Sequence, residues 1–222
     1  DTPQILIAGC GTWQQSISTS SRFKDCNILA IDLSVSSLSY AKRKTEELGI
    51  TNIEYLQADI FDLGKLERQF DIVESTGVLH HMDDPMAGWR VLTRCLKTGG
   101  LMKIGLYSKL ARQDVVSLRE EINQLGIESN KAAMKSFRRD VINLPREHHK
   151  RILSSSDFYS LSTLRDLLFH VQEHHFTIPQ IQGCLAELGL ELCGFEDRIV
   201  QKFKSQNLAE DDIYDLEKWN AF

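Results

Sequence analysis

The chain has 222 residues and a formal net charge of −5 at pH 7, with 42% hydrophobic and 26% charged residues. This length suits one α/β domain with a helical cap, and the composition is that of a globular protein rather than a disordered or fibrous one. The negative net charge argues against nucleic acid as a partner, because a phosphate backbone would be repelled.

The first half of the chain alternates short apolar runs with amphipathic stretches, which is the pattern of β-α-β units around a parallel sheet. Five strands are expected, over residues 5–8, 27–32, 53–58, 70–75 and 101–107. Helices are expected between them. Ser34 is an N-cap candidate for a helix that ends at Gly49, and Asp84 with Pro85 begins another helix that ends at Gly99.

The second half reads as long, charge-rich helices. Helices are expected over 115–125, 131–142, 162–171 and 177–189, followed by a strand over 190–195 and by helical spacing over 208–222. The predicted fold is α/β, a Rossmann-like doubly wound and mostly parallel sheet with helices on both faces and a helical cap insertion. Its expected parts are a cofactor-binding core over 1–107, a cap or substrate insertion over 108–178, and a helix-strand-helix segment over 179–222 that completes the core.

Cysteine usage and the lack of long apolar runs bear on the cellular compartment. The five cysteines are scattered and form no C-x-x-C pair, so neither a disulfide framework nor a thiolate zinc site is indicated. No apolar run approaches the roughly 18 residues that span a bilayer, and the first residues lack the layout of a signal peptide. A cytoplasmic protein with no membrane partner is therefore expected.

The turn after the first strand is rich in glycine and places Gly9, Cys10 and Gly11 where a backbone can lie against a nucleotide. Asp32 ends the second strand, where a carboxylate can accept hydrogen bonds from both ribose hydroxyls. Together these features predict an adenosine cofactor. A dinucleotide fingerprint has a third glycine where this chain has Gln14, so an NAD-dependent oxidoreductase is the weaker alternative.

Six segments, in this order, resemble the motifs of class I, Rossmann-like, seven-stranded S-adenosylmethionine-dependent methyltransferases: Ile5 to Thr12, Ala30 to Ser34, Gln57 to Ile60, Phe70 to Val73, Gly77 to Met82 and Leu96 to Leu101. The resemblance implies S-adenosylmethionine as cofactor and in-line methyl transfer to a small molecule or a protein side chain. It also implies a set of cofactor-binding residues, namely Gly9, Cys10, Gly11, Asp32, Leu33, Asp59, Ile60, Ser75 and Gly77. In this set the glycines hold the methionine portion, Asp32 binds the ribose, and Asp59 holds the base.

Two positions depart from the family pattern. Ile7 stands where the family usually has an acidic residue that orients the methionine end of the cofactor, and Trp13 replaces the usual third glycine of the turn. These departures motivate a second hypothesis, in which the chain is a non-catalytic binding module with a methyltransferase fold.

The candidates for chemistry at the methyl acceptor follow the strand ends. His80 and His81 lie just past the fourth strand, where a histidine could take a proton from the acceptor, although a role in shaping the loop is the favoured interpretation. Glu74 is a weaker candidate in the same crevice. Tyr107, Phe158 and Tyr159 are the predicted substrate contacts. No metal site is predicted, and His148 with its neighbours is interpreted as a solvated basic face.

The segments Asp157 to Ser160 and Arg165 to His174 more faintly resemble bacterial methyltransferases that are often joined to tetratricopeptide repeats. This resemblance suggests that the chain is a piece of a longer protein with further N-terminal domains. The residues after the fourth strand are Ser75-Thr76-Gly77-Val78 rather than the Asn/Asp-Pro-Pro-aromatic turn that grips a flipped base, which also argues against a nucleic-acid substrate.

Overall fold

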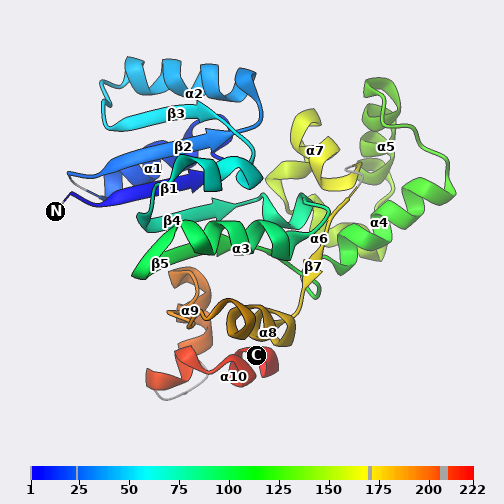
Figure 1. Ribbon diagram of the computed structural model, residues 1–222. Helices are drawn as coiled ribbons and strands as arrows, with labels where there is room; N and C mark the ends of the chain where they lie inside the picture. The colour runs from blue at the N-terminus through cyan, green and yellow to red at the C-terminus, as the bar shows by residue number, and fades with distance from the viewer. Residues whose placement is uncertain (1, 24, 170–171, 206–209) are drawn as a thin grey trace. The chain divides into compact units, whose positions relative to one another are not determined.

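A computed structural model describes residues 2–23, 25–169, 172–205 and 210–222. The chain divides into two compact units, the first made of Asp1–Leu106 with Ile178–Phe222 and the second of Tyr107–Thr177. Figure 1 shows the elements of both units in chain order. No helix in the described ranges is both long and apolar enough to cross a membrane.

The first unit is built on a parallel sheet of five strands in the order β3-β2-β1-β4-β5. The strands are β1 Gln4–Ala8, β2 Asn27–Asp32, β3 Ile53–Gln57, β4 Phe70–Thr76 and β5 Leu96–Gly105. The predicted Rossmann-like α/β class is confirmed. Strand order reverses between β1 and β4, and in open α/β sheets this reversal point is where ligands bind, beyond the carboxyl ends of the strands.

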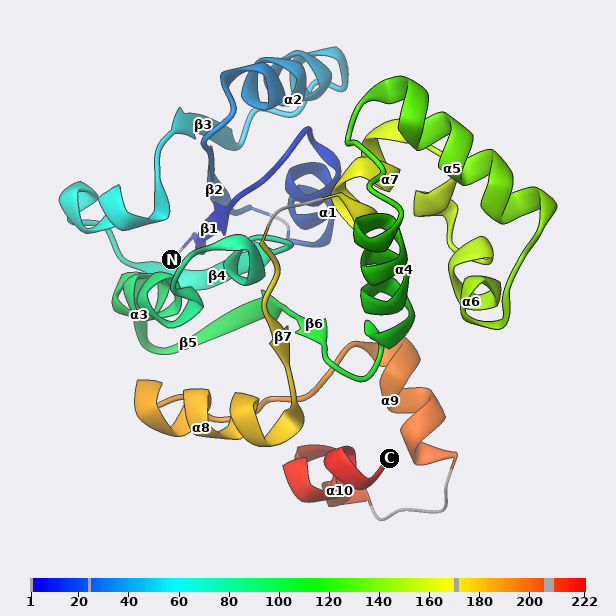
Figure 2. The same cartoon turned by 90° about the vertical axis from the view of Figure 1, so that its right-hand side faces the viewer.

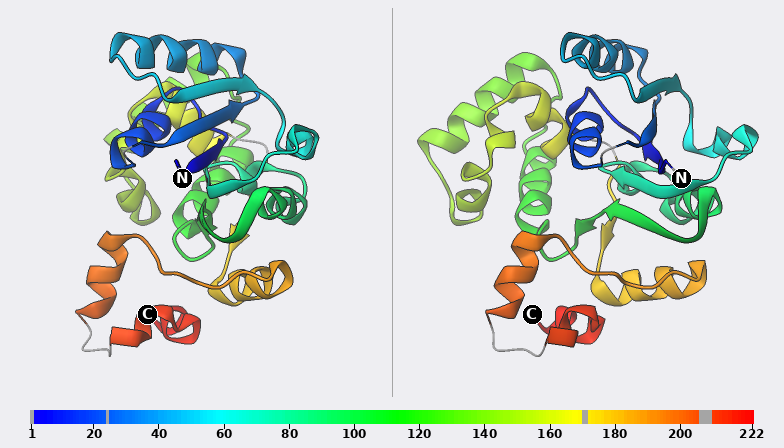
Figure 3. Two further views of the ribbon diagram at one scale, coloured as in Figure 1. Left: turned by 60° about the vertical axis from the view of Figure 1, so that its left-hand side comes forward. Right: turned by 90° about the vertical axis from the view of Figure 1, so that its left-hand side faces the viewer.

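Helices lie on both sides of this sheet (Figure 3). The alternation of side chains along the strands divides the core between its two faces. On one face, Ile5 and Ile7 pack with Ile28 and with Leu38 of helix α2, Val35–Glu47. On the other face, Leu6 packs with residues of helix α3, Pro85–Cys95, and of the 3-10 helix η1, Ile60–Leu66. Helix α1, Gln14–Arg22, follows the glycine turn.

The helix starts in this unit follow the capping signals of the sequence. Ser34 accepts a hydrogen bond from the Ser37 amide at 3.2 Å, which caps α2. Asp84 accepts one from the Ala87 amide at 3.0 Å, with Pro85 in the first position of α3. Both predicted caps are confirmed, because an N-cap depends on residues within one turn of helix.

The predicted strand over 190–195 is wrong. Helix α8, Ile178–Leu188, is followed by chain without a strand, and then by α9 Asp197–Lys204, η5 Glu210–Tyr214 and α10 Leu216–Ala221. Leu190 packs against the core instead, and Gly194 has a φ of +132°, outside the range of an extended L-residue. An apolar run forms a strand only where a sheet edge pairs with it. Leu208 lies outside the described residues.

The second unit is a helical bundle with one short pair of strands (Figure 2). Its helices are α4 Gln113–Gln124, α5 Lys131–Asn143, η3 Glu147–His149, α6 Lys150–Leu153, η4 Ser156–Phe158 and α7 Leu161–Leu168. Strands β6, Tyr107–Ser108, and β7, His175–Phe176, pair in parallel, which the expectation of helices alone missed. The predicted end of α7, at His170 and Val171, lies outside the described residues.

Replacement of Leu118 in α4 tests the packing of the core of the second unit. Its side chain is fully buried among residues of α5 and α7. Leu118→Ala should therefore lower the free energy of unfolding by about 2–5 kcal/mol, measured by chemical denaturation. Leu125, which is 60% exposed at the end of the same helix, is the matched control, and Leu125→Ala should change this free energy by less than about 0.5 kcal/mol. Equal effects would contradict the packing described.

Candidate functional site

The glycine turn after β1 is fixed by the end of β2. The backbone amides of Gly9 and Cys10 both donate to the Ile31 carbonyl at 2.9 Å, and the Gly11 amide donates to Oδ2 of Asp32 at 2.8 Å. Gly9 and Gly11 have φ values of +78° and +58°, which favour glycine. A Cβ atom at Gly11 would meet nothing within 4 Å, so the turn leaves open space above it.

Asp32 is held in one orientation by backbone donors. Its Oδ2 accepts the Gly11 amide, and its Oδ1 accepts the Ser34 amide at 2.9 Å. Each carboxylate oxygen has a second lone pair, so two acceptor positions remain for a ligand. Leu33, the next residue, is 67% exposed. The end of β2 therefore presents an oriented carboxylate beside an exposed apolar side chain.

The other predicted cofactor residues differ in how they are placed. Asp59 caps η1 by accepting the Phe61 amide at 2.9 Å. Ile60 is 6% exposed and packs into the core, and its contact with the base stays a prediction. Ser75 is also buried, and its hydroxyl donates to the Ala8 carbonyl at 3.1 Å, so it ties β4 to β1 instead of offering the hydroxyl to a ligand. Gly77, with a φ of +80°, has open space where a Cβ would lie.

Residues near the end of β4 include two histidines and one buried acid. His80 is 1% exposed, whereas His81 is half-buried, and their rings meet edge to face at 4.3 Å. His81 is thus the more accessible of the two catalytic candidates.

Burial raises the pKa of the Cys10 thiol to about 12, with the Asp32 charge acting in the same direction, so Cys10 is a neutral thiol rather than a nucleophile.

Glu74 of β4, expected to be a weaker candidate, is buried and held by several side chains. Its carboxylate is 2% exposed and accepts hydrogen bonds from three side chains of α1. The donors are Thr19 Oγ1 at 2.7 Å, Arg22 Nη2 at 3.1 Å and Gln15 Nε2 at 3.4 Å. An acid inside the apolar run of β4 was the available signal, because charged residues are seldom buried without partners.

Comparison with known proteins identifies the chain segment that carries this geometry. Residues 6–104 match the family model described as "Methyltransferase domain". Over this segment the chain is similar to methyltransferase domains. The match spans β1 to β5, and so it includes the glycine turn, Asp32 and Glu74.

Curated relatives of the methyltransferase domain include enzymes with different named acceptors. Malonyl-[acyl-carrier protein] O-methyltransferase of Enterobacter lignolyticus is 31% identical over 117 residues, which are 53% of this chain and 43% of that protein. (S)-coclaurine N-methyltransferase of Papaver somniferum is 28% identical over 102 residues, which are 46% of this chain and 29% of that protein. The chain thus spans less than half the length of these relatives.

A solved structure matches beyond the methyltransferase domain. PKMT2 from Rickettsia typhi covers 100% of this chain and 46% of its own, with a TM-score of 0.71 and 17% sequence identity. The structure of the same protein in complex with AdoHcy gives a TM-score of 0.68 and 19% identity. At these identities the likeness shows the fold.

The predicted substrate residues belong to the second unit and have unequal surroundings. Phe158 is fully buried in the core of that unit, and its role as a wall of the substrate pocket stays a prediction. Tyr159 is 54% exposed, and its hydroxyl donates to the Leu153 carbonyl at 2.8 Å. The Tyr107 ring lies 3.5 Å from the guanidinium of Arg112, and burial raises the pKa of its hydroxyl.

A buried acid near Tyr107 organises the strand pair of the second unit. The Glu173 side chain has no exposed surface. Its carboxylate oxygens lie 3.0, 2.8 and 2.7 Å from side-chain nitrogens of Arg112, Arg119 and His175. Burial alone would raise the pKa of this carboxyl, but the hydrogen bond from His175 and the two guanidinium charges hold the pKa below its usual range. Glu173 therefore stays ionised and fixes the arginine that covers Tyr107.

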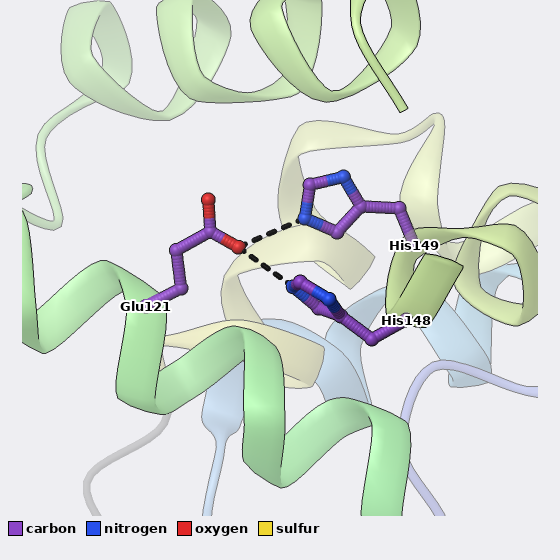
Figure 4. A group of neighbouring side chains, drawn as sticks. All are labelled: Glu121, His148 and His149. Carbon is purple, nitrogen blue, oxygen red and sulfur yellow. Dashed lines mark hydrogen bonds and ion pairs between the residues drawn. The ribbon is translucent and has the colours of Figure 1, made fainter. Parts of the chain in front are cut away.

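A second cluster in this unit joins Glu121 to two histidines that the sequence suggested were solvated (Figure 4). Oε2 of Glu121 lies 2.9 Å from His148 Nε2 and 2.8 Å from His149 Nε2, and these are groups that could hold a metal ion. However, the Arg146 amide donates to His149 Nδ1 at 3.1 Å, which leaves the hydrogen of the neutral ring on Nε2. A metal at Nε2 would need that hydrogen to move, so the geometry favours a hydrogen-bonded cluster.

The glycine turn allows a paired test of the local geometry. A Cβ at Gly9 would lie 2.1 Å from Cγ2 of Val78, whereas one at Gly11 is unobstructed. Gly11→Ala should cost about 1–2 kcal/mol of unfolding free energy through backbone strain alone. Gly9→Ala should cost about 2–5 kcal/mol, because overpacking adds to the strain. Denaturation of Gly9→Ala with Val78→Ala should show partial rescue, and a lack of rescue would contradict the contact.

Proposed function

We propose that this chain is an S-adenosylmethionine-dependent methyltransferase that transfers a methyl group to a small molecule or a protein side chain. The observation that carries the proposal is the Asp32 carboxylate, fixed by the Gly11 and Ser34 amides beside an open glycine turn. A carboxylate at the end of the second strand of such a sheet is suited to accept two ribose hydroxyls.

The residues around the reversal point of the sheet fit the cofactor. The open space at Gly11 would receive the chain that joins the ribose to the methionine end, and the exposed Leu33 side chain offers an apolar surface for adenine. Asp59, at the end of β3, is the proposed partner of the adenine amino group. When bound, the cofactor supplies a methyl group activated by a sulfonium charge.

The chain's own part in the reaction is to orient and desolvate the reactants, because in-line displacement needs little else. We assign His81 the role of taking a proton from the acceptor, since its ring is accessible while that of His80 is buried. His80 then supports the position of His81 through their edge-to-face contact. Tyr107 and Tyr159 are kept as proposed substrate contacts.

The class of acceptor is proposed from the relatives. Their names include an O-methyltransferase and an N-methyltransferase, so an oxygen or nitrogen acceptor in a small molecule or a protein side chain is the proposal. A cytoplasmic location and a fusion to further N-terminal domains remain predictions from the sequence. The alternative of a non-catalytic binding module rests on Trp13 and on Ile7, which is fully buried and apolar.

Replacement of Asp32 tests the cofactor assignment. Asp32→Ala removes the proposed ribose contacts, and the affinity for S-adenosylmethionine should fall at least tenfold in isothermal calorimetry. Asp71 is the control, since it is the second residue of β4, at the amino edge of the sheet, and pairs there with Lys97. Asp71→Ala should leave the affinity within about twofold. An absence of binding by the unaltered chain at millimolar ligand would overturn the function itself.

A further inference from the structure

The reversal point of the sheet lies between β1 and β4, so a ligand bound there could reach acidic residues of these two strands as well as Asp32 of β2. β1 carries none, and its Ile7 is fully buried. β4 carries Asp71, at its amino end, and Glu74. The strand register places Glu74 directly beside Ile7. The carboxylate missing from β1 is therefore present one strand away, at the same level of the sheet.

The surroundings of Glu74 leave it short of buried positive charge. Among the described residues its cationic partner is Arg22, whose side chain is 48% exposed and contacts Oε1. Oε2 is met by two neutral donors, the Thr19 hydroxyl at 2.7 Å and the Gln15 amide at the longer distance of 3.4 Å. A hydrogen bond of 3.4 Å is weak and easily exchanged for a stronger donor. An ammonium group would be such a donor.

Two other acceptors beside the turn already have backbone donors. The Ile31 carbonyl accepts two backbone amides, and the Asp32 oxygens accept one amide each. If Asp32 also binds the ribose, a second carboxylate is needed for an ammonium at the other end of the cofactor.

We infer that Glu74 binds the ammonium group of the methionine portion of the cofactor, in the role that an acid on β1 would otherwise have, with Gln15 as the side chain that gives way. This inference rests on the proposed function. It assigns Thr19 the role of aiming Oε2, and Arg22 the role of a replaceable counter-charge at Oε1.

A purely structural role is the competing explanation, because the same hydrogen bonds join α1 to the sheet. The two roles differ in their ligand dependence. 5′-Methylthioadenosine has the adenine and ribose of the cofactor but no ammonium group. An ammonium contact therefore affects only S-adenosylhomocysteine, whereas a distorted turn affects both ligands.

The test is calorimetry of the full chain with S-adenosylhomocysteine and with 5′-methylthioadenosine. Glu74→Gln keeps the size of the side chain and should weaken S-adenosylhomocysteine at least tenfold, while 5′-methylthioadenosine changes by less than about twofold. Arg22→Gln removes the cationic partner of Glu74. This variant should keep its affinity for S-adenosylhomocysteine within about twofold, or bind it more tightly. Glu74→Asp, which draws the charge back by one methylene, should show the same selective loss if Glu74→Gln does not fold.

The inference would be overturned if Glu74→Gln lost equal affinity for both ligands, or if Arg22→Gln showed the same selective loss as Glu74→Gln. Glu74 would then have only a structural role in joining α1 to the sheet. An unchanged affinity for S-adenosylhomocysteine would overturn it as well. A failure of the proposed function gives a different result, since the unaltered chain would then bind neither ligand.

Discussion

The hydrogen bond from the Gly11 amide to the Asp32 carboxylate is the interaction on which the rest of the site depends. It joins the turn after β1 to the end of β2, and the Ile31 carbonyl accepts two further amides of the same turn. The turn can lie this close only because Gly9 leaves room for Val78 and has a positive φ. One short segment thereby places an open backbone surface and an oriented carboxylate side by side.

The strand order places β4 beside this turn and so adds residues of β4 to the proposed cofactor site. Because β4 pairs with β1, residues far apart in the sequence become neighbours at the point where the sheet reverses direction. Glu74 faces α1 there and is paired by side chains 52 to 59 residues away in the chain. The strand register pairs the apolar Ile7 of β1 with the buried acid of β4, and the proposed ammonium site uses this acid.

Features that depend on neighbouring residues could be predicted from the sequence, and those that depend on distant packing could not. Ser34 and Asp84 were identified as caps because a cap is formed within one helical turn. The position of Asp32 at the end of β2 could be predicted from the strand-turn-strand spacing. The strand over 190–195 was wrongly predicted and the burial of Phe158 was missed, because the sheet edge that a strand needs and the helices that bury Phe158 are set by the whole fold. The contact of Glu121 with His149, 28 residues away, had no local signal either.

The most direct test of the account is a crystal structure of the chain with S-adenosylhomocysteine. We predict the ribose hydroxyls within hydrogen-bond distance of Asp32, the thioether chain over Gly11, and the ammonium group at Glu74 with the Gln15 amide displaced. A ligand bound at the reversal point with its ammonium group on another residue would contradict the role of Glu74. A ligand bound away from the carboxyl ends of β1 and β4 would contradict the site as a whole.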